Sequence, residues 1–335
     1  MNVVYLIGNG FDLAQGLKTG YKDFYKSYKL SKPINEVERE IITSITEKTD
    51  TWSNLEQSLG SFTKEVKDAN DFTVAYESLY LKLRDYLQSE EKRFVAENIE
   101  RYRKELANPF WDLSYLEQQD YHKFVSGFFG STSIIDIISF NYTEIFEQAI
   151  GFQYQPIPLK GDYFRDGIQL NNVYKVHGYL RGTFLMGVND TSQIANPSFA
   201  NNPDICDFLV KPQANTNLGQ SIDRFAIRAI ENANLIVVFG MSIGETDRQW
   251  WKLVAERLKS PNVRMIVFHH VEPPIPEDRR WKEEKEKRKL KKHFEEVAEV
   301  PEGARDEMNA KITVSMRGLM FNPHVMRYDL ENNGN

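Results

Sequence analysis

The chain has 335 residues, of which 41% are hydrophobic and 27% charged, so it has the composition of a soluble globular protein and the length for one large α/β domain or two smaller ones. Its net charge of −6 argues against a dedicated nucleic-acid binder, and its single cysteine, Cys206, excludes an intramolecular disulfide and a cysteine-built zinc site. No apolar run approaches the roughly 18 residues of a membrane span, and no signal peptide precedes the first glycines, so we expect a cytoplasmic protein without membrane contact.

The first predicted element is a buried strand, which a glycine turn follows. Val3–Ile7 are apolar or β-branched, and Gly8 and Gly10 allow a tight turn in which the backbone comes close to a ligand. Asn9 or Asp12 can cap a following helix, whose N-terminus would direct unpaired N–H groups at the turn. This order of elements is typical of nucleotide pyrophosphate sites, although the third glycine of the dinucleotide fingerprint is missing. A plain structural turn is the alternative.

Residues 20–130 carry almost no strand pattern. Leu79, Leu83 and Leu87 fall at helical spacing, and the charged segment 90–104 continues in the same style. We therefore predict an all-α insertion between the first and second strands. Aromatic residues at its end are expected to pack helices onto the sheet, with a ligand platform as the alternative.

Two further strands each end in a candidate site residue. Ile134–Phe140 is a second buried strand, and Asn141 follows its C-terminal end, where ligands of open α/β sheets bind. Capping of the next helix is the alternative role for Asn141. Val173–Val176 is predicted as a short strand that delivers His177 at its end. Residues 188–217 are rich in Asn, Ser and Pro and are predicted to form a long loop or lid.

A second unit of strand, glycine turn and helix follows. A helix is predicted over 221–231, and Leu235–Phe239 is the most strand-like run in the chain. Gly240 and Ser242 belong to the turn that follows it. Asp247 then lies in the first turn of the next predicted helix.

The last part of the chain completes the sheet. A strand is predicted over 263–269, and 312–316 is predicted as an edge strand. Lys, Arg and Glu alternate over 279–296, which is typical of an exposed helix with i,i+4 ion pairs. A solvated helix or an oligomer contact is expected there in preference to nucleic-acid binding. The Asn-rich end is predicted to fray.

Five short blocks are spread over residues 3 to about 250: Gly8–Ala14, Trp52–Glu56, Ser139–Thr143, Val176–Gly178 and Gly240–Asp247. Together they resemble, in the same order, the blocks of the AbiH family of bacteriophage abortive-infection proteins. More distantly, the same blocks resemble sirtuin-like NAD-binding proteins, which carry a glycine turn, an Asn after a strand, a His-Gly and a Gly-x-Ser.

The resemblance implies an α/β fold with a sirtuin-like (Rossmann-type), mainly parallel sheet, helices on both faces and a large all-α insertion. Residues 1–19 and 131–320 would form the nucleotide-binding α/β domain, 20–130 the helical insertion and 321–335 a tail. Because the carboxyl ends of parallel strands share one edge, the candidate residues should line a single crevice.

The resemblance also implies a ligand and a reaction. The ligand would be NAD or NADP, with ADP-ribose left open. Its binding residues would be Gly8, Asn9, Gly10, Asp12, Gly240, Ser242 and Asp247. In the sirtuin-like NAD hydrolases the residues that match His177 and Asn141 surround the nicotinamide ribose, so these two are the catalytic candidates. No metal is expected, since the pyridinium is already a cationic leaving group.

The sequence departs from the sirtuin-like pattern at two positions. Thr143 stands where those enzymes carry an Asp, and Asp12 stands where they carry a small hydroxyl residue. The leading hypothesis is a metal-independent NAD(P) glycohydrolase in phage defence, with a homo-oligomer and an unknown phage trigger as expected partners. A nucleotide-sensing module that acts through a partner protein is the alternative. A nuclease is a third possibility, against which the acidic charge counts.

Overall fold

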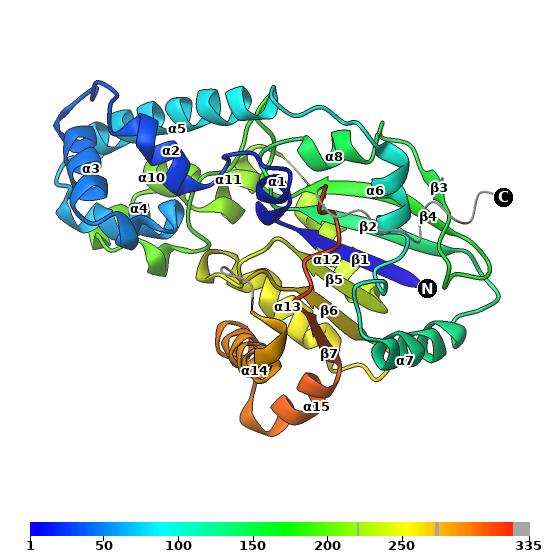
Figure 1. The fold of residues 1–335 in the computed structure, drawn as a ribbon. Coiled ribbons are helices and arrows are strands. Elements are labelled where there is room, and N and C mark those ends of the chain that lie inside the picture. The colour runs from blue at the N-terminus through cyan, green and yellow to red at the C-terminus, as the bar shows by residue number, and fades with distance from the viewer. Residues whose placement is uncertain (220, 272–274, 324–335) are drawn as a thin grey trace.

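The computed structural model describes residues 1–219, 221–271 and 275–323, and a single sheet forms its centre (Figure 1). Within these residues the sheet has seven strands in the order β3-β4-β2-β1-β5-β6-β7. All neighbouring pairs are parallel except β3 and β4. The strands are β1 (Asn2–Ile7), β2 (Ser133–Ser139), β3 (Ile157–Leu159), β4 (Ile168–Lys175), β5 (Leu235–Phe239), β6 (Arg264–Phe268) and β7 (Ile312–Ser315).

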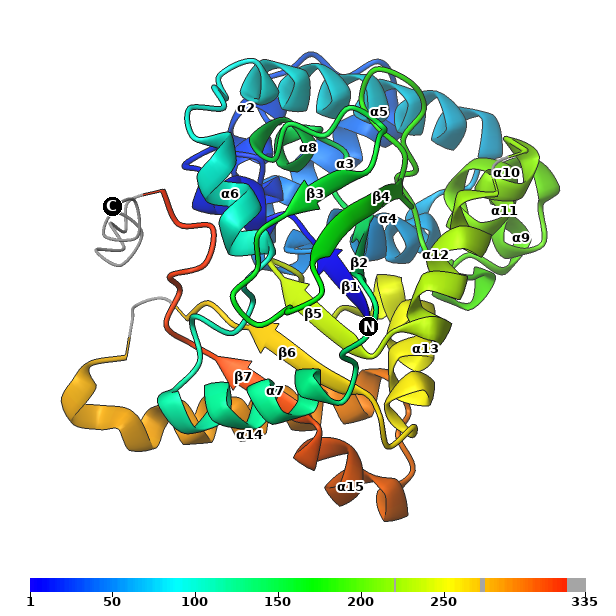
Figure 2. The same cartoon turned by 90° about the vertical axis from the view of Figure 1, so that its right-hand side faces the viewer.

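Helices cover both faces of this sheet, as predicted. Alternate residues of β1 enter two different cores: Val3 and Tyr5 face one, whereas Val4 and Leu6 face the other. α7 (Tyr115–Ser126) and α14 (Arg280–Val297) lie on opposite sides of β7 in Figure 1, and in the view of Figure 2 α7 lies in front of α14. The first core contains α1 (Gly10–Ala14), α6 (Ile99–Leu106), α7 (Tyr115–Ser126) and α8 (Ile145–Ala149). The second contains α12 (Ile222–Asn232), α13 (Arg248–Leu258), α14 (Arg280–Val297) and α15 (Arg305–Ala310).

A third core lies beyond the sheet and joins two distant parts of the chain. We call it the helical cluster; it forms the left-hand end of the molecule in Figure 1. From the first part come α2 (Tyr21–Tyr28), α3 (Glu36–Glu47), α4 (Leu55–Phe62) and α5 (Ala69–Glu91). From the second come α9 (Pro197–Ala200) and α10 (Pro203–Leu209), and α11 (Lys211–Asn217) follows them in the chain. The rings of Tyr80 and Phe184 stack between the two parts, with centroids 4.1 Å apart.

The prediction of a long loop over 188–217 is therefore wrong. The segment forms three short helices, and Asn196 and Asn202 cap two of them ahead of a proline. Phe199 and Leu209 enter the helical cluster, so packing stabilises helices too short to show a periodic pattern.

Other differences concern the borders of elements. The strand predicted from Val173 begins at Ile168, because Ile168 and Leu170 are buried and pair with β2 before a register shift beside Asp136. The short antiparallel β3 was not predicted. The predicted edge strand at 312–316 is confirmed as β7. Of the predicted tail, residues 324–335 lie outside the described part of the chain. No helix in the described ranges has both the length and the apolar character of a membrane span.

Candidate functional site

Four neighbouring strands, β4, β2, β1 and β5, end at one edge of the sheet, where a cavity of about 620 Å³ opens. The helical cluster forms part of its wall through residues of α2 and α4, among them Tyr21 and Glu56. The sequence-predicted site residues that line it are Gly8, Asn9, Asp12, Asn141, His177, Gly240, Ser242 and Asp247. Gly10, the remaining predicted site residue, does not line the cavity.

The two glycine turns pack against each other. The N–H of Gly10 donates to the carbonyl oxygen of Gly240 at 2.7 Å, and a Cβ on Gly10 would lie 2.4 Å from the Gly240 Cα. Gly240 also has a φ of +67°, a conformation that favours glycine. The glycines are therefore needed for the contact between the turns, whether or not a phosphate approaches them.

At the first turn, several of the N–H groups that were expected to be unpaired have partners within the protein. The N–H groups of Gly8, Gly10 and Phe11 donate to Phe239, Gly240 and Gly8 carbonyls, respectively, and α1 is only five residues long. Asn9 holds the N-cap position without a capping bond; its Oδ1 instead accepts from the Thr19 hydroxyl at 2.6 Å.

The second turn is more open. Ser242 is exposed at the cavity, and among the residues that the structure describes the N–H groups of 241–244 find no acceptor. A short 3₁₀ turn, Glu245–Asp247, separates this segment from α13. Hydroxyl and phosphate oxygens of a ligand could be held here.

Asp12 is fully buried and fixes the side chain of Asn141. The Asn141 Nδ2 donates to Asp12 Oδ1 at 2.9 Å, and the Thr143 hydroxyl donates to Asp12 Oδ2 at 2.6 Å. Burial raises the pKa of Asp12 to about 7, although the Thr143 bond opposes the shift. Since the amide N–H group points at Asp12, the Asn141 Oδ1 is left as the free acceptor, and no described group donates to it.

His177 is buried and contacts a carboxylate and an ammonium group. Its Nε2 lies 3.2 Å from Asp247 Oδ1 and 3.4 Å from Lys211 Nζ. Burial alone would raise the pKa of Asp247, but the positive charge of Lys211 and its contact with His177 outweigh burial and lower that pKa. Asp247 is thus an anion that lies against the imidazole.

Three residues of this network were not predicted as site residues: Lys211, Glu56 and Tyr142. Lys211 Nζ lies 2.7 Å from Glu56 Oε2 and 3.6 Å from Asp247 Oδ1, and the Tyr142 hydroxyl donates to Glu56 Oε1 at 2.5 Å. Burial opposes the charge of Lys211, yet the carboxylates of Asp247 and Glu56 raise its pKa overall. Glu56 and Tyr142 fall within blocks that resemble the family, whereas no local pattern marks Lys211.

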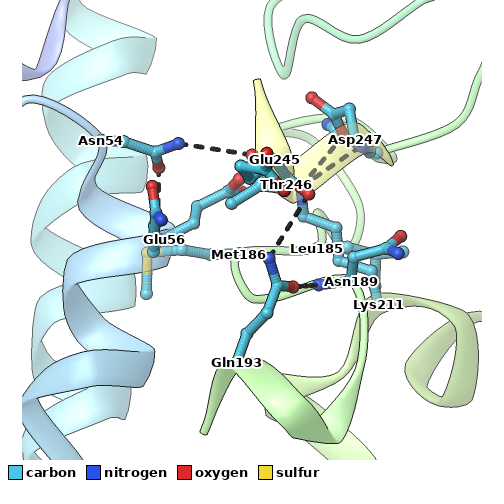
Figure 3. Close-up of polar contacts among 12 residues, drawn as sticks. Asn54, Glu56, Leu185, Met186, Asn189, Gln193, Lys211, Glu245, Thr246 and Asp247 are labelled. Atoms are coloured by element: carbon cyan, nitrogen blue, oxygen red, sulfur yellow. Dashed lines mark hydrogen bonds and ion pairs between the residues drawn. The ribbon is translucent and has the colours of Figure 1, made fainter. Parts of the chain in front are cut away.

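The helical cluster holds the 3₁₀ turn that carries Asp247 (Figure 3). Asn54, the N-cap residue of α4, donates from Nδ2 to the Thr246 hydroxyl at 3.4 Å, and Gln193 Nε2 donates to the Glu245 carbonyl at 3.3 Å, so both parts of the chain that build the cluster position this turn. Lys211 reaches the same turn from α11.

The arrangement offers groups for proton transfer and for hydrogen bonding to hydroxyls. His177 can accept a proton, and Asn141 can accept a hydrogen bond beside it. Within the described ranges, no group of three or more His, Cys, Asp and Glu side chains is placed to hold a metal ion.

Fold and site together define a mixed α/β protein with a cavity, lined in part by polar side chains, at the carboxyl edge of a mainly parallel sheet. The chain matches the family described as Bacteriophage abortive infection AbiH over residues 4–269. Because this match covers most of its length, the chain belongs to the AbiH family. No curated protein matches it.

Proposed function

We propose that this protein acts in abortive phage defence by hydrolysing NAD or NADP at the bond between nicotinamide and ribose. One observation supports this above the others: His177 and Asn141 line one cavity, and a carboxylate holds each of them, Asp247 and Asp12, respectively. The cavity volume of about 620 Å³ falls in the range of small-molecule and cofactor sites. Membership of the AbiH family supports the setting in phage defence.

The proposed reaction uses the two held side chains. The bond from ribose C1′ to the nicotinamide nitrogen breaks, and its electron pair cancels the positive charge of the pyridinium. Water adds to C1′, and His177 accepts the proton that the water loses. Asn141 Oδ1 accepts a hydrogen bond from the water or from a ribose hydroxyl and so fixes its direction.

The remaining contacts would hold the dinucleotide. Ser242 and the open N–H groups of the second turn suit a phosphate or ribose hydroxyl. Both oxygens of Asp12 already accept bonds, so in this proposal Asp12 acts through Asn141 instead of binding the ribose.

Release of free nicotinamide from NAD and NADP by the purified protein tests the proposal. His177→Gln and Asn141→Ala should each lower the rate by about 10²–10⁴ and leave dinucleotide binding within a few-fold. The two losses should not add, because both residues act on one transition state. His122→Gln is the matched control, since His122 is exposed on α7 and does not line the cavity.

The alternative of a nucleotide sensor gives a different result. Wild-type protein that binds the dinucleotide tightly under infection-mimicking conditions but releases no nicotinamide would contradict the enzyme and favour the sensor. Expression in cells adds a second readout: growth arrest should disappear in His177→Gln if it depends on turnover, and should follow affinity if it depends on sensing.

A further inference from the structure

A small gap, distinct from the cavity, also borders His177 and Asp247. Its volume is about 10 Å³, and its lining also includes Lys211 and Asn215 of α11, Asp223 of α12, Thr246 and Gln249. The gap adjoins a second cavity of about 410 Å³, with which it shares Asn215 and Asp223.

Three buried oxygen atoms on the residues around this gap lack a hydrogen-bond donor among the described residues: Asn215 Oδ1, Asp223 Oδ1 and Asp247 Oδ1. Asn215 is 5% exposed, and its Nδ2 donates to Asp223 Oδ2 at 2.6 Å, which leaves its carbonyl oxygen as a free acceptor. Asp247 Oδ1 has ion-pair contacts with His177 and Lys211, but neither is a well-directed hydrogen bond. A buried acceptor without a donor is costly, so three of them around one gap call for a shared donor.

The volume of the gap limits which hydrogen-bond donor can occupy it. A volume of about 10 Å³ is that of one water-sized probe and excludes a larger ligand. A water donates two hydrogen bonds and can accept one from the Lys211 ammonium, so it suits a gap beside oxygens that lack donors. A cation is less suited, because Lys211 already supplies a positive charge within 3.6 Å of Asp247.

We propose that this gap holds one ordered water, which donates to Asp247 Oδ1 and to Asp223 or Asn215 and thereby ties α11 and α12 to the His177 cluster. Burial raises the pKa of Asp223, as expected for a carboxylate with few donors. Where His177 acts as the base of the proposed function, Asn215 and Asp223 are positioning residues, since they reach the imidazole through the water and Asp247.

Loss of the water should loosen Asp247 and His177 without touching the ligand. Asp223→Leu should therefore lower kcat for nicotinamide release about tenfold and leave KM within twofold. Asp223→Asn keeps an acceptor oxygen and should restore most of the rate. Asp204→Asn, an exposed carboxylate of α10, is the control. Equal kcat in Asp223→Leu and wild type would overturn the positioning role.

A crystal structure of the full chain without ligand, at a resolution that shows ordered solvent, tests the water itself. We expect one solvent peak about 2.6–3.2 Å from Asp247 Oδ1 and from an oxygen of Asp223 or Asn215. The peak should persist in Asp223→Asn and disappear in Asp223→Leu. An ordered gap without a peak, or a peak with the short contacts of a metal ion, would overturn the proposal. If the wild type releases no nicotinamide, the proposed function fails, while the diffraction result still decides the water.

Discussion

At the residue scale, the carboxyl group of Asp12 links the first turn to Asn141, which follows the end of β2. It is fully buried, and its two partners are an amide and a hydroxyl, neither of which carries a charge. Burial therefore dominates its ionisation and raises its pKa to about 7, so that both the acid and the carboxylate are populated near neutral pH. The Thr143 hydroxyl can accept from the acid as readily as it donates to the carboxylate.

This ionisation predicts how stability depends on pH. The pKa of Asp12 rises from its ordinary value of 3.8 to about 7 in the folded state, so the folded protein binds the proton more tightly than the unfolded chain. The stabilising contribution of the Asp12 proton is complete below pH 3.8 and is lost as the pH rises through about 7. The free energy of unfolding of Asp12→Asn should therefore exceed that of wild type by up to about 4 kcal/mol at pH 8, which corresponds to a shift of about 3 pKa units. At pH 4 the two proteins should differ little.

Urea denaturation of both proteins at the two pH values measures this difference. Asp204→Asn serves as the exposed control and should show no such pH dependence. An Asp12→Asn variant that is less stable than wild type at pH 8 would show that the carboxylate form is the stabilising one.

Lys211 makes the second prediction at this scale. It is 5% exposed and contacts Glu56 and Asp247, so its removal leaves two buried carboxylates without their cation. Lys211→Met should destabilise the protein by about 3–5 kcal/mol.

The matched control is Lys26→Met. The Lys26 side chain is 76% exposed, and its pair with Asp23 should contribute less than about 1 kcal/mol to stability. Chemical denaturation compares the two variants. Similar small losses of stability in both variants would mean that Glu56 or Asp247 becomes protonated in Lys211→Met at little cost in free energy.

At the scale of elements, the contact between the two glycine turns joins β1 to β5 at the edge where the cavity opens. A Cβ on Gly10 would lie 2.4 Å from Gly240 Cα, and one on Gly240 would lie 2.6 Å from the Phe11 nitrogen. Backbone atoms cannot move aside as a flexible side chain can. The turns must therefore separate if either glycine is replaced.

Gly10→Ala and Gly240→Ala should each lower the free energy of unfolding, measured by urea denaturation, by about 1–3 kcal/mol. Gly303→Ala is the control, because a Cβ there meets nothing within 4 Å. An unchanged midpoint in Gly10→Ala would contradict the packing of the turns. If the proposed NAD binding is weaker in these variants, the displaced backbone would account for it, so glycine substitution does not report on phosphate binding alone.

At the scale of the whole molecule, the helical cluster is a core built from residues 20–91 and 180–210 together. Its two parts meet across ring contacts such as that of Tyr80 with Phe184, and both parts hold the turn of Asp247. The site is therefore complete only when the distant segments have packed.

Phe184→Ala should destabilise the protein by about 3–5 kcal/mol and raise amide exchange in α5 and α10 together, while β1 and β2 stay protected. Hydrogen exchange followed by mass spectrometry resolves these segments. Phe110 is equally buried but lies in the core beneath α7, so Phe110→Ala should instead raise amide exchange in the helices that pack on the sheet. Exchange that rises in α10 but not in α5 would show that the two parts fold independently.

The sequence by itself determined the strands and the ends that carry the candidate residues. Val3–Ile7 and Leu235–Phe239 are continuous apolar runs that only a sheet covered on both faces can bury, and the glycines after them mark where each strand stops. Because parallel strands end on one side, the meeting of His177 and Asn141 at one cavity followed from their positions after β4 and β2.

Only the tertiary structure decided which groups face these residues. Lys211 and Glu56 are separated by 155 positions, and no local pattern connects an ammonium on α11 with a carboxylate on α4. The orientation of Asn141 depends in the same way on Asp12, which the sequence suggested as a cap or ribose ligand. Strand formation is a property of neighbouring residues, whereas a buried charge or amide is satisfied by whichever segment the completed fold brings against it.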